Sequence, residues 1–144
     1  GLSRLEYLNL EQNQLGCHYG YYSSLPDSLG DLSKVRALFI GYNLFVGTIP
    51  SSLGNLIYLE DLDLQYNALT GPIPEVIGGI SNLTNLILSN NSLTSSIPDS
   101  FTMLEKLLLL NIQHNSLTGK ISIPDNNWKL TMLDASFNKF NGSV

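Results

Sequence analysis

Hydrophobic residues recur along this chain in an order that repeats about every 24 residues. The most regular copy is LEDLDLQYNALTGPIPEVIGGISN, residues 59–82, and the copies share the frame L-x-x-L-x-L-x-x-N-x-L-x-G-x-I-P-x-x-L-G-x-L-x-x. Because a repeat of this size buries its hydrophobic side only against its neighbours, the period predicts a stacked array. The copies begin at Leu5, Val35, Leu59, Leu83, Leu107 and Leu130.

The L-x-L segment near the start of each copy predicts a short strand. Its period-two alternation turns one face of the strand inward, and the similar return paths predict that neighbouring strands pair in parallel. An Asn stands at the ninth position of every copy, where its amide can both donate to and accept from the backbone of a turn. We therefore predict a structural Asn ladder made of Asn13, Asn43, Asn67, Asn91, Asn115 and Asn138.

The second half of each copy predicts a turn, another extended piece and a short helix. Gly47, Gly71 and Gly119 fall where the backbone needs conformational freedom or close approach. A Pro ends the extended piece in three copies, and the segments that follow are too short for a full α-helix. We expect short 3₁₀ or one-turn helices there, within residues 51–56, 75–80 and 99–104.

Two copies depart from the frame. The first contains six extra residues around positions 16–24, which predict a small loop holding three Tyr residues. The fifth is one residue short and reads IPDNNWKL over residues 123–130. We expect Trp128 to cover the core that this shorter path leaves open.

These motifs resemble the plant-specific class of leucine-rich repeat. Its distinguishing piece, L-T-G-x-I-P-x-x-L-G-x-L, stands at residues 69–80 with Ile for Leu, and nearly intact at 45–56. The resemblance implies an α/β solenoid, a right-handed superhelix with a parallel β-sheet on its concave face and short 3₁₀ helices on its convex face. Residues 1–144 would form one array of about five full repeats with partial ends. Family members normally carry cysteine-paired caps, which this sequence lacks, so we expect a fragment of a longer protein.

Charge and hydropathy narrow the classes of partner. The net charge is −5, and the seven Lys and Arg residues are scattered, which argues against a nucleic-acid backbone as partner. No stretch approaches the 18 consecutive apolar residues of a membrane span, so we expect no direct membrane insertion of this segment. The single Cys17 cannot form an intrachain disulfide and is neutral about cellular compartment.

No catalytic or cofactor-binding motif stands out. The sequence has no G-x-S-x-G, no phosphate-binding glycine loop and no zinc-ligand spacing. His18 and His114 are separated by about four turns of the predicted solenoid, so they cannot share one site. We therefore predict no enzymatic activity, no metal and no cofactor.

Residues that the frame leaves free are the candidates for binding a partner. Exposed aromatic residues on a sheet face are typical interface anchors, although the rings could instead cover the sheet edge. Two neighbouring acidic residues fit a cationic group of a ligand, and the alternative is that they are solvated surface charges. Three outward aliphatic residues on neighbouring strands indicate either a covered patch or local degeneration of the pattern. These candidates are Phe39, Tyr42, Tyr66, His114 and Phe137, then Asp61 and Asp63, then Ile87, Leu109 and Met132.

Three N-glycosylation sequons give modest support for secretion, at Asn82, Asn90 and Asn141. A glycan on Asn90 would cover part of the aromatic column that contains Tyr42 and Tyr66, which argues against a ligand centred there.

Three functions remain open at this point. The first is the ligand-binding part of an extracellular receptor-like kinase or receptor-like protein, with a protein or peptide ligand and possibly a co-receptor. The second is a secreted inhibitor of a cell-wall hydrolase, similar to the polygalacturonase-inhibiting group. The third is a structural subunit of an intracellular complex. The first two place the chain outside the cell or at its surface.

Overall fold

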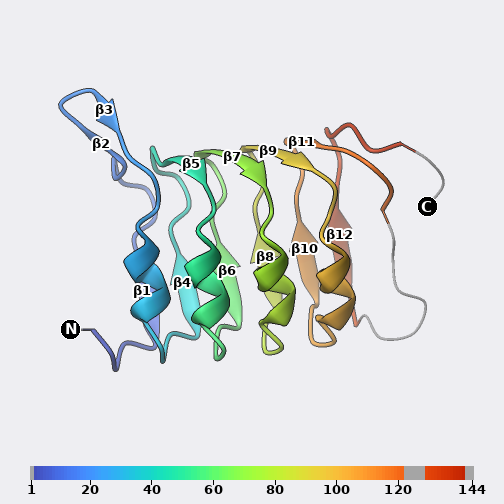
Figure 1. Ribbon diagram of the computed structural model, residues 1–144, viewed down its shortest axis with the longest axis horizontal. Coiled ribbons are helices and arrows are strands. Elements are labelled where there is room, and N and C mark those ends of the chain that lie inside the picture. The colour runs from blue at the N-terminus through green and yellow to red at the C-terminus, as the bar shows by residue number, and fades with distance from the viewer. Residues whose placement is uncertain (1, 122–128, 142–144) are drawn as a thin grey trace.

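The repeats fold into a curved solenoid with two parallel sheets and a row of 3₁₀ helices. The computed structural model describes residues 2–121 and 129–141, so the expected role of Trp128 lies outside the described residues. Each repeat contributes one strand to an inner sheet, and four of them add a strand to a second sheet at one edge (Figure 1). The solenoid fold expected from the sequence is thereby confirmed.

The inner sheet contains six parallel strands within the described residues. Its register repeats along the chain, because Leu38 pairs with Leu62, Leu62 with Leu86 and Leu86 with Leu110. The strands, in spatial order, are β1 (Tyr7–Asn9), β4 (Ala37–Phe39), β6 (Asp61–Asp63), β8 (Asn85–Ile87), β10 (Leu109–Asn111) and β12 (Met132–Asp134).

The second sheet follows the turn after each inner strand. It consists of β5 (Val46–Thr48), β7 (Ala68–Pro72), β9 (Ser92–Ser95) and β11 (Ser116–Leu117), again all parallel. Gly47, Gly71 and Gly119 have φ angles of 77°, 74° and 81°, which confirms that the backbone takes a left-handed conformation favoured by glycine at this position. In the fourth copy Ser95 adopts the same conformation, with a φ of 70°.

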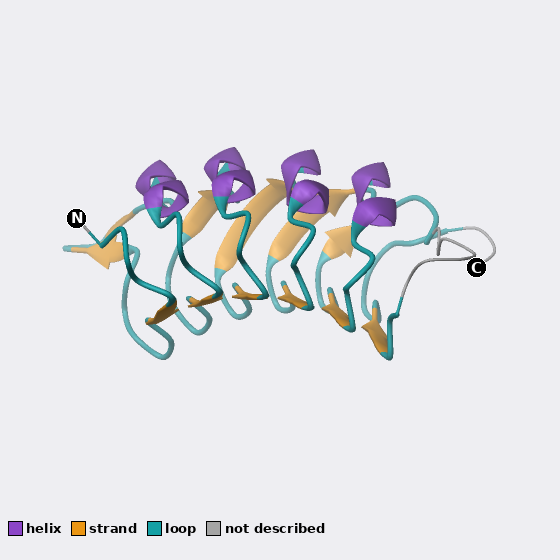
Figure 2. Cartoon of the chain, turned by 90° about the horizontal axis from the view of Figure 1, so that it is seen from below, coloured by secondary structure: helices purple, strands orange, loops and turns teal. Residues whose placement is uncertain are grey.

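The 3₁₀ helices form the outer layer of the arc, and the inner sheet lies on its concave side (Figure 2). Each helix directly follows a Pro, whose fixed φ sets the chain for the turn. The helices are η1 (Asp27–Asp31), η2 (Ser51–Asn55), η3 (Glu75–Gly79) and η4 (Asp99–Met103). The three short helices predicted from the sequence are therefore confirmed.

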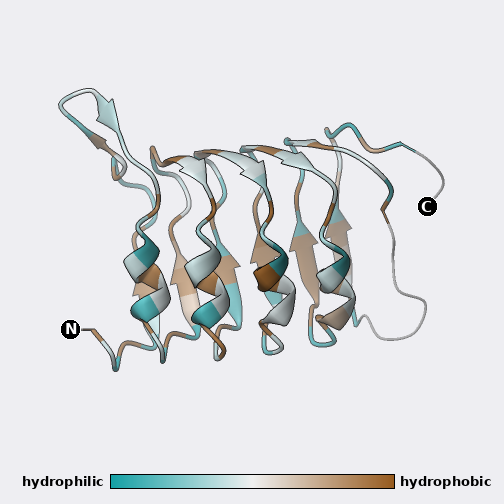
Figure 3. Cartoon of the chain, in the orientation of Figure 1, coloured by the Kyte–Doolittle hydropathy of each residue, from teal (hydrophilic) through white to brown (hydrophobic). Residues whose placement is uncertain are grey.

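The core runs between the layers as columns of aliphatic side chains. Leu38, Leu62, Leu86 and Leu110 are each at most 1% exposed, as are their partners from the helical layer, such as Leu53 and Phe101. Hydrophobic residues accordingly recur in the strands of successive repeats (Figure 3). Burial falls toward both ends, where Leu8 and Leu133 are only partly covered.

The Asn at the ninth position joins each repeat to the one before it. Asn43 Nδ2 donates to the carbonyl oxygens of Ile40 at 3.0 Å and Gly41 at 3.1 Å in its own repeat, and of Leu10 at 2.9 Å in the preceding one. Its Oδ1 accepts from the N–H of Leu15 at 3.0 Å. The same two-way bonding to the preceding repeat recurs at Asn67, Asn91, Asn115 and Asn138.

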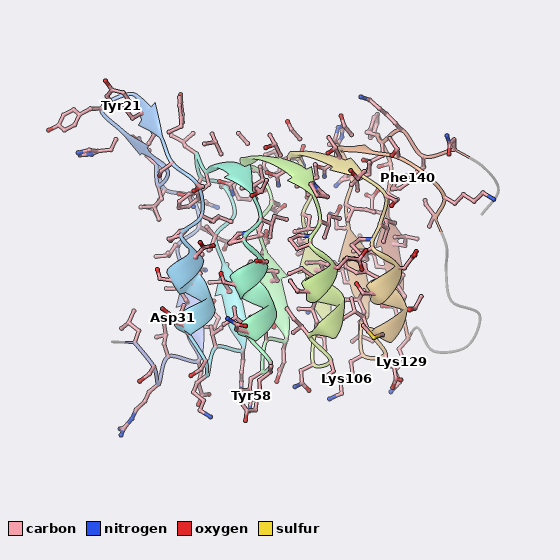
Figure 4. All side chains as sticks on the ribbon, viewed as in Figure 1. Tyr21, Asp31, Tyr58, Lys106, Lys129 and Phe140 are labelled. Atoms are coloured by element: carbon pink, nitrogen blue, oxygen red, sulfur yellow. The ribbon has the colours of Figure 1, made fainter. Side chains whose placement is uncertain are left out.

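The six extra residues of the first repeat form a β-hairpin. Strand β2 (Cys17–His18) pairs antiparallel with β3 (Tyr21–Tyr22), and the hairpin projects from the edge of the array (Figure 1). Its turn residues Tyr19 and Gly20 both have positive φ, at 48° and 80°, as a two-residue type I′ turn requires. The expected small loop is thus a hairpin, and Tyr21 lies in its second strand, next to the turn (Figure 4).

Candidate ligand-binding face

The outward side chains of the inner sheet form two columns, which we call the concave face. Strand pairing places their members side by side, for example Asp61 beside Asn85 and Asp63 beside Ile87. The first column is Tyr7, Ala37, Asp61, Asn85, Leu109 and Met132, and the second is Asn9, Phe39, Asp63, Ile87, Asn111 and Asp134.

The concave face is divided into three chemically different parts. In the aromatic part, at the β1 end of the sheet, the rings of Tyr7 and Phe39 are in tilted contact with centroids 5.4 Å apart, and Tyr7 is 59% exposed. The apolar part consists of half-buried Ile87 and Leu109 with Met132, which is 48% exposed. The face changes from aromatic through polar to aliphatic along the array.

The polar middle part contains both predicted acidic residues. The Asn85 amide donates to a carboxylate oxygen of half-buried Asp61 through a short hydrogen bond. No Lys or Arg belongs to the twelve residues of the concave face, so no cationic side chain of this face neutralises the two acidic residues. A cationic or amide-bearing ligand group fits this arrangement.

Asp63 corrects one of the expectations from the sequence. Its residue is only 4% exposed, so it is not a solvated surface charge. Oδ1 accepts from the Gln65 N–H at 2.9 Å and Oδ2 accepts from Gln65 Nε2 at 2.7 Å. The cause is Gly41 in the neighbouring repeat, where a Cβ would lie 3.1 Å from both Asp63 Oδ1 and Gln65 Cγ. The missing side chain lets these groups close over Gly41.

Burial also changes the acidity of Asp63. Desolvation raises the pKa of its carboxyl above the ordinary 3.8, against the opposing effect of the two hydrogen bonds from Gln65. We conclude that Asp63 holds Gln65 in position and that Asp61 is the more accessible carboxylate of the pair.

The predicted aromatic column lies just beyond the ends of the inner strands, in the turns. We call it the turn row. All its members have left-handed φ angles between 49° and 56°, which is uncommon for residues other than Gly. The turn row comprises Gln12, Tyr42, Tyr66, Asn90, His114 and Phe137.

Two pairs of rings stack within the turn row. Tyr42 and Tyr66 have centroids 4.4 Å apart and planes at 13°, and His114 and Phe137 have centroids 4.1 Å apart and planes at 7°. Asn90 separates the two pairs. Phe39 does not belong to this row, since it lies on the concave face beside Tyr7.

A lateral groove that the sequence did not reveal opens beside the turn row. It has a volume of about 520 Å³ and lies between the hairpin, the turns and the second sheet. We call it the lateral groove, and its lining residues are Tyr22, Asn43, Leu44, Val46, Tyr66, Asn67, Ala68 and Asn90. The sequence signal that could have indicated it is the hairpin insertion, which supplies one wall.

The described residues that could bind a metal ion do not form a cluster. Among residues 2–121 and 129–141, no cluster of three or more His, Cys, Asp or Glu side chains has a geometry suited to a metal ion. In the same described ranges, no helix is both long enough and apolar enough to pass through a membrane.

Comparison with known proteins identifies the family. A model described as Leucine rich repeat matches residues 33–93 and 57–117. Stacked parallel repeats of this kind define a leucine-rich-repeat solenoid, and the chain belongs to the leucine-rich repeat family, in its plant type. No match was found among curated protein sequences.

Similar solved structures are ectodomains of plant receptors. One is the plant peptide hormone receptor RGFR1 in complex with RGF2, with 37% identity and a TM-score of 0.89 over 99% of this chain and 22% of that chain. Another is the Arabidopsis receptor kinase HAESA in complex with the peptide hormone IDA and the co-receptor SERK1, with 37% identity and a TM-score of 0.81 over 95% and 22%. A third is the BIR3–SERK2 complex from Arabidopsis thaliana, with 31% identity and a TM-score of 0.78 over 96% and 71%. The chain thus spans about a fifth of the length of the first two.

Proposed function

We propose that this chain is a non-catalytic recognition module in the extracellular part of a receptor-like kinase or receptor-like protein. Its concave face would bind an extended peptide or protein segment at the cell surface. The observation that carries the proposal is the three-part concave face, whose aromatic, acidic and aliphatic groups point outward from a rigid sheet. Likeness to the RGFR1 and HAESA ectodomains, which are in complex with peptide hormones, supports it.

The geometry of the concave face defines the kind of ligand. Six strands at a spacing of about 4.8 Å extend over about 24 Å, which matches about seven residues of extended peptide. A basic or amide side chain near the centre would lie beside Asp61 and Asn85. Apolar side chains at one end would contact Leu109 and Met132, and an aromatic or apolar group at the other end would contact Tyr7. A co-receptor would then contact both the bound peptide and a lateral edge of the solenoid.

Selection from a random ten-residue peptide display library tests this proposal. We expect the secreted protein to retain peptides enriched in a central Lys or Arg, with micromolar Kd by calorimetry. Met132→Asp places a charge in the apolar part of the concave face. It should weaken peptide binding about tenfold or more, because a solvated carboxylate replaces the contact between Met132 and an apolar side chain of the peptide.

The matched control is Met103→Asp, since Met103 is 56% exposed but lies on the outer helix η4. It should leave the Kd unchanged. If no peptide binds above background, or if both Met variants affect binding equally, the concave face is not the recognition surface.

A further inference from the structure

One glycosylation sequon is placed at the end of the lateral groove. Asn90, in Asn90-Asn91-Ser92, lines the groove together with Tyr66 and Ala68. Its side chain makes no hydrogen bond within the described part of the chain, unlike Asn82, whose Nδ2 donates to the Ile57 carbonyl at 2.9 Å. A substituent on Asn90 would therefore break no existing side-chain hydrogen bond and would start beside the groove.

The lining of the groove suits neutral sugars. None of its eight residues is charged, and they combine apolar side chains with Tyr rings and the Asn90 amide. The amides of Asn43 and Asn67 are held in the Asn ladder. Tyr66 is 46% exposed, and one face of its ring is covered by Tyr42 at 4.4 Å. Its other face is turned toward the next member of the turn row, which is Asn90. A pyranose ring attached to Asn90 would pack its apolar C–H face there, against the large apolar surface of the Tyr66 ring.

These observations point to one occupant, the chain's own glycan. We infer that Asn90 carries an N-linked glycan whose first sugars lie in the lateral groove against Tyr66. The inference rests on the proposed extracellular location. In the glycosylation reaction, Asn90 Nδ2 loses a proton and forms a bond to the anomeric carbon of an oligosaccharide. The donor is a lipid pyrophosphate-linked oligosaccharide, whose sugar–phosphate bond breaks as the lipid pyrophosphate leaves.

A glycan in this position would assign separate roles to the two surfaces. The lateral groove and the Tyr66 end of the turn row would be closed by sugar, and ligand would be confined to the concave face. Ser92→Ala, which removes the sequon without changing Asn90, should therefore leave the Kd of a selected peptide unchanged.

The test uses the full-length protein secreted from cultured mammalian cells. Peptide mapping after enzymatic deglycosylation should show Asn90 occupied. The native rate of glycan release by peptide N-glycosidase F should rise about twofold to tenfold in Tyr66→Asn, which is the range expected for loss of one ring contact. Asn tolerates the left-handed backbone at this position, so the variant should fold. The matched control is Tyr58→Asn, a ring 39% exposed at the opposite edge of the array from the hairpin (Figure 4).

Two results would overturn the inference. One is an unmodified Asn90 in the secreted protein, and the other is an occupied Asn90 whose release rate is unaffected by Tyr66→Asn. Failure of the proposed function would be visible separately, because no peptide would then be selected by either the wild type or Ser92→Ala.

Discussion

At the scale of single residues, the Asn ladder supplies hydrogen bonds to backbone groups of the turns that are partly buried between repeats. Asn67 Oδ1 accepts from the Phe45 N–H at 3.0 Å, and Nδ2 donates to the Ile40 and Leu64 carbonyl oxygens, both at 3.2 Å. These groups are partly buried between repeats, where an unpaired polar group is costly. The amide therefore satisfies its own turn and the turn of its neighbour at the same time.

Replacing one member of the ladder should reveal this cost. In Asn67→Ala, the Phe45 N–H and the Ile40 carbonyl lose a partner, and we expect the free energy of unfolding to fall by about 2–4 kcal/mol. Asn13→Ala is the control, because Asn13 is exposed at the end of the array and donates only to Leu10 and Glu11. It should cost less than about 1 kcal/mol. Urea unfolding followed by circular dichroism compares the two, and equal losses would show that the ladder contributes little.

The two carboxyls Asp63 and Asp134 should affect stability with opposite dependence on pH. Desolvation raises the pKa of Asp63 in the folded protein, so the folded state binds its proton more tightly and ionisation of Asp63 lowers stability as pH rises above 3.8. Asp63→Asn removes that loss. The stability of this variant relative to wild type should therefore increase with pH and level off near neutrality.

Asp134 provides the internal comparison. Hydrogen bonds from the Ser136 hydroxyl and N–H lower the pKa of its carboxyl below 3.8. Its contribution is present above 3.8 and disappears as pH falls through the lowered pKa. Asp134→Asn should thus be less stable than wild type at neutral pH and approach it in acid. Urea unfolding of both variants from about pH 2 to pH 7 measures the trends, and parallel curves for the two would contradict this assignment.

Two features at this scale could not be predicted from the sequence. The left-handed φ of the turn row is carried at four of its six positions by Gln, Tyr or Phe, and only Asn90 and His114 are residue types enriched in such a backbone. The burial of Asp63 depends on Gly41 one repeat away, which becomes its neighbour only once the strands are in register. Both depend on contacts between repeats, whereas the frame describes one repeat at a time.

At the scale of elements, the hairpin is an addition to a repeat that closes without it. The Ser23 N–H donates to the Gly16 carbonyl at 2.7 Å, so the two residues at its base already form a hydrogen-bonded pair. Such a pair can be closed by a two-residue type I′ turn. The length of the insertion predicted only a loop, because two-residue strands leave too short an alternation to recognise.

Shortening the hairpin should therefore have little effect on stability. Replacing Cys17–Tyr22 by Asn-Gly should change Tm by less than about 3 °C, because it removes mainly exposed side chains and leaves the base intact. Gly16→Ala should be more damaging, by about 1–3 kcal/mol, because Gly16 has a φ of 89° and an added Cβ would lie 2.7 Å from the Phe45 backbone nitrogen. Thermal unfolding followed by circular dichroism tests both variants. A collapse of Tm on shortening would show that the hairpin is part of the fold.

At the scale of the whole molecule, the fold followed from the sequence more completely than the site. The period, the strands and the outer helices all depend on buried positions that recur in each copy, such as Leu62 and Ile77. The same pattern is therefore seen several times in one sequence. A binding surface consists of the positions that differ between copies. Which of these remain exposed depends on the neighbouring repeats, as the contrast between buried Asp63 and exposed Met132 illustrates.

The same architecture makes the ends of an isolated array its weakest points. Every internal repeat is covered on both sides, whereas Leu2 is 63% exposed and Leu8 and Leu133 are only partly buried. We expect residues 1–144 expressed alone to self-associate through these ends, since solenoids need capping repeats for solubility. Sedimentation should show a mass that rises with concentration.

Designed capping repeats with a polar outer face, fused to both ends, should abolish this association and raise Tm. Each 100 Å² of apolar surface that they cover contributes about 2.5 kcal/mol, which for a chain of this size corresponds to about 5–10 °C in Tm. A fusion of the same length that carries an unstructured Gly/Ser segment is the control, because it adds mass without covering the ends. If the uncapped chain is monomeric at high concentration, or if the caps do not change Tm, the open ends are not what limits the stability of the array.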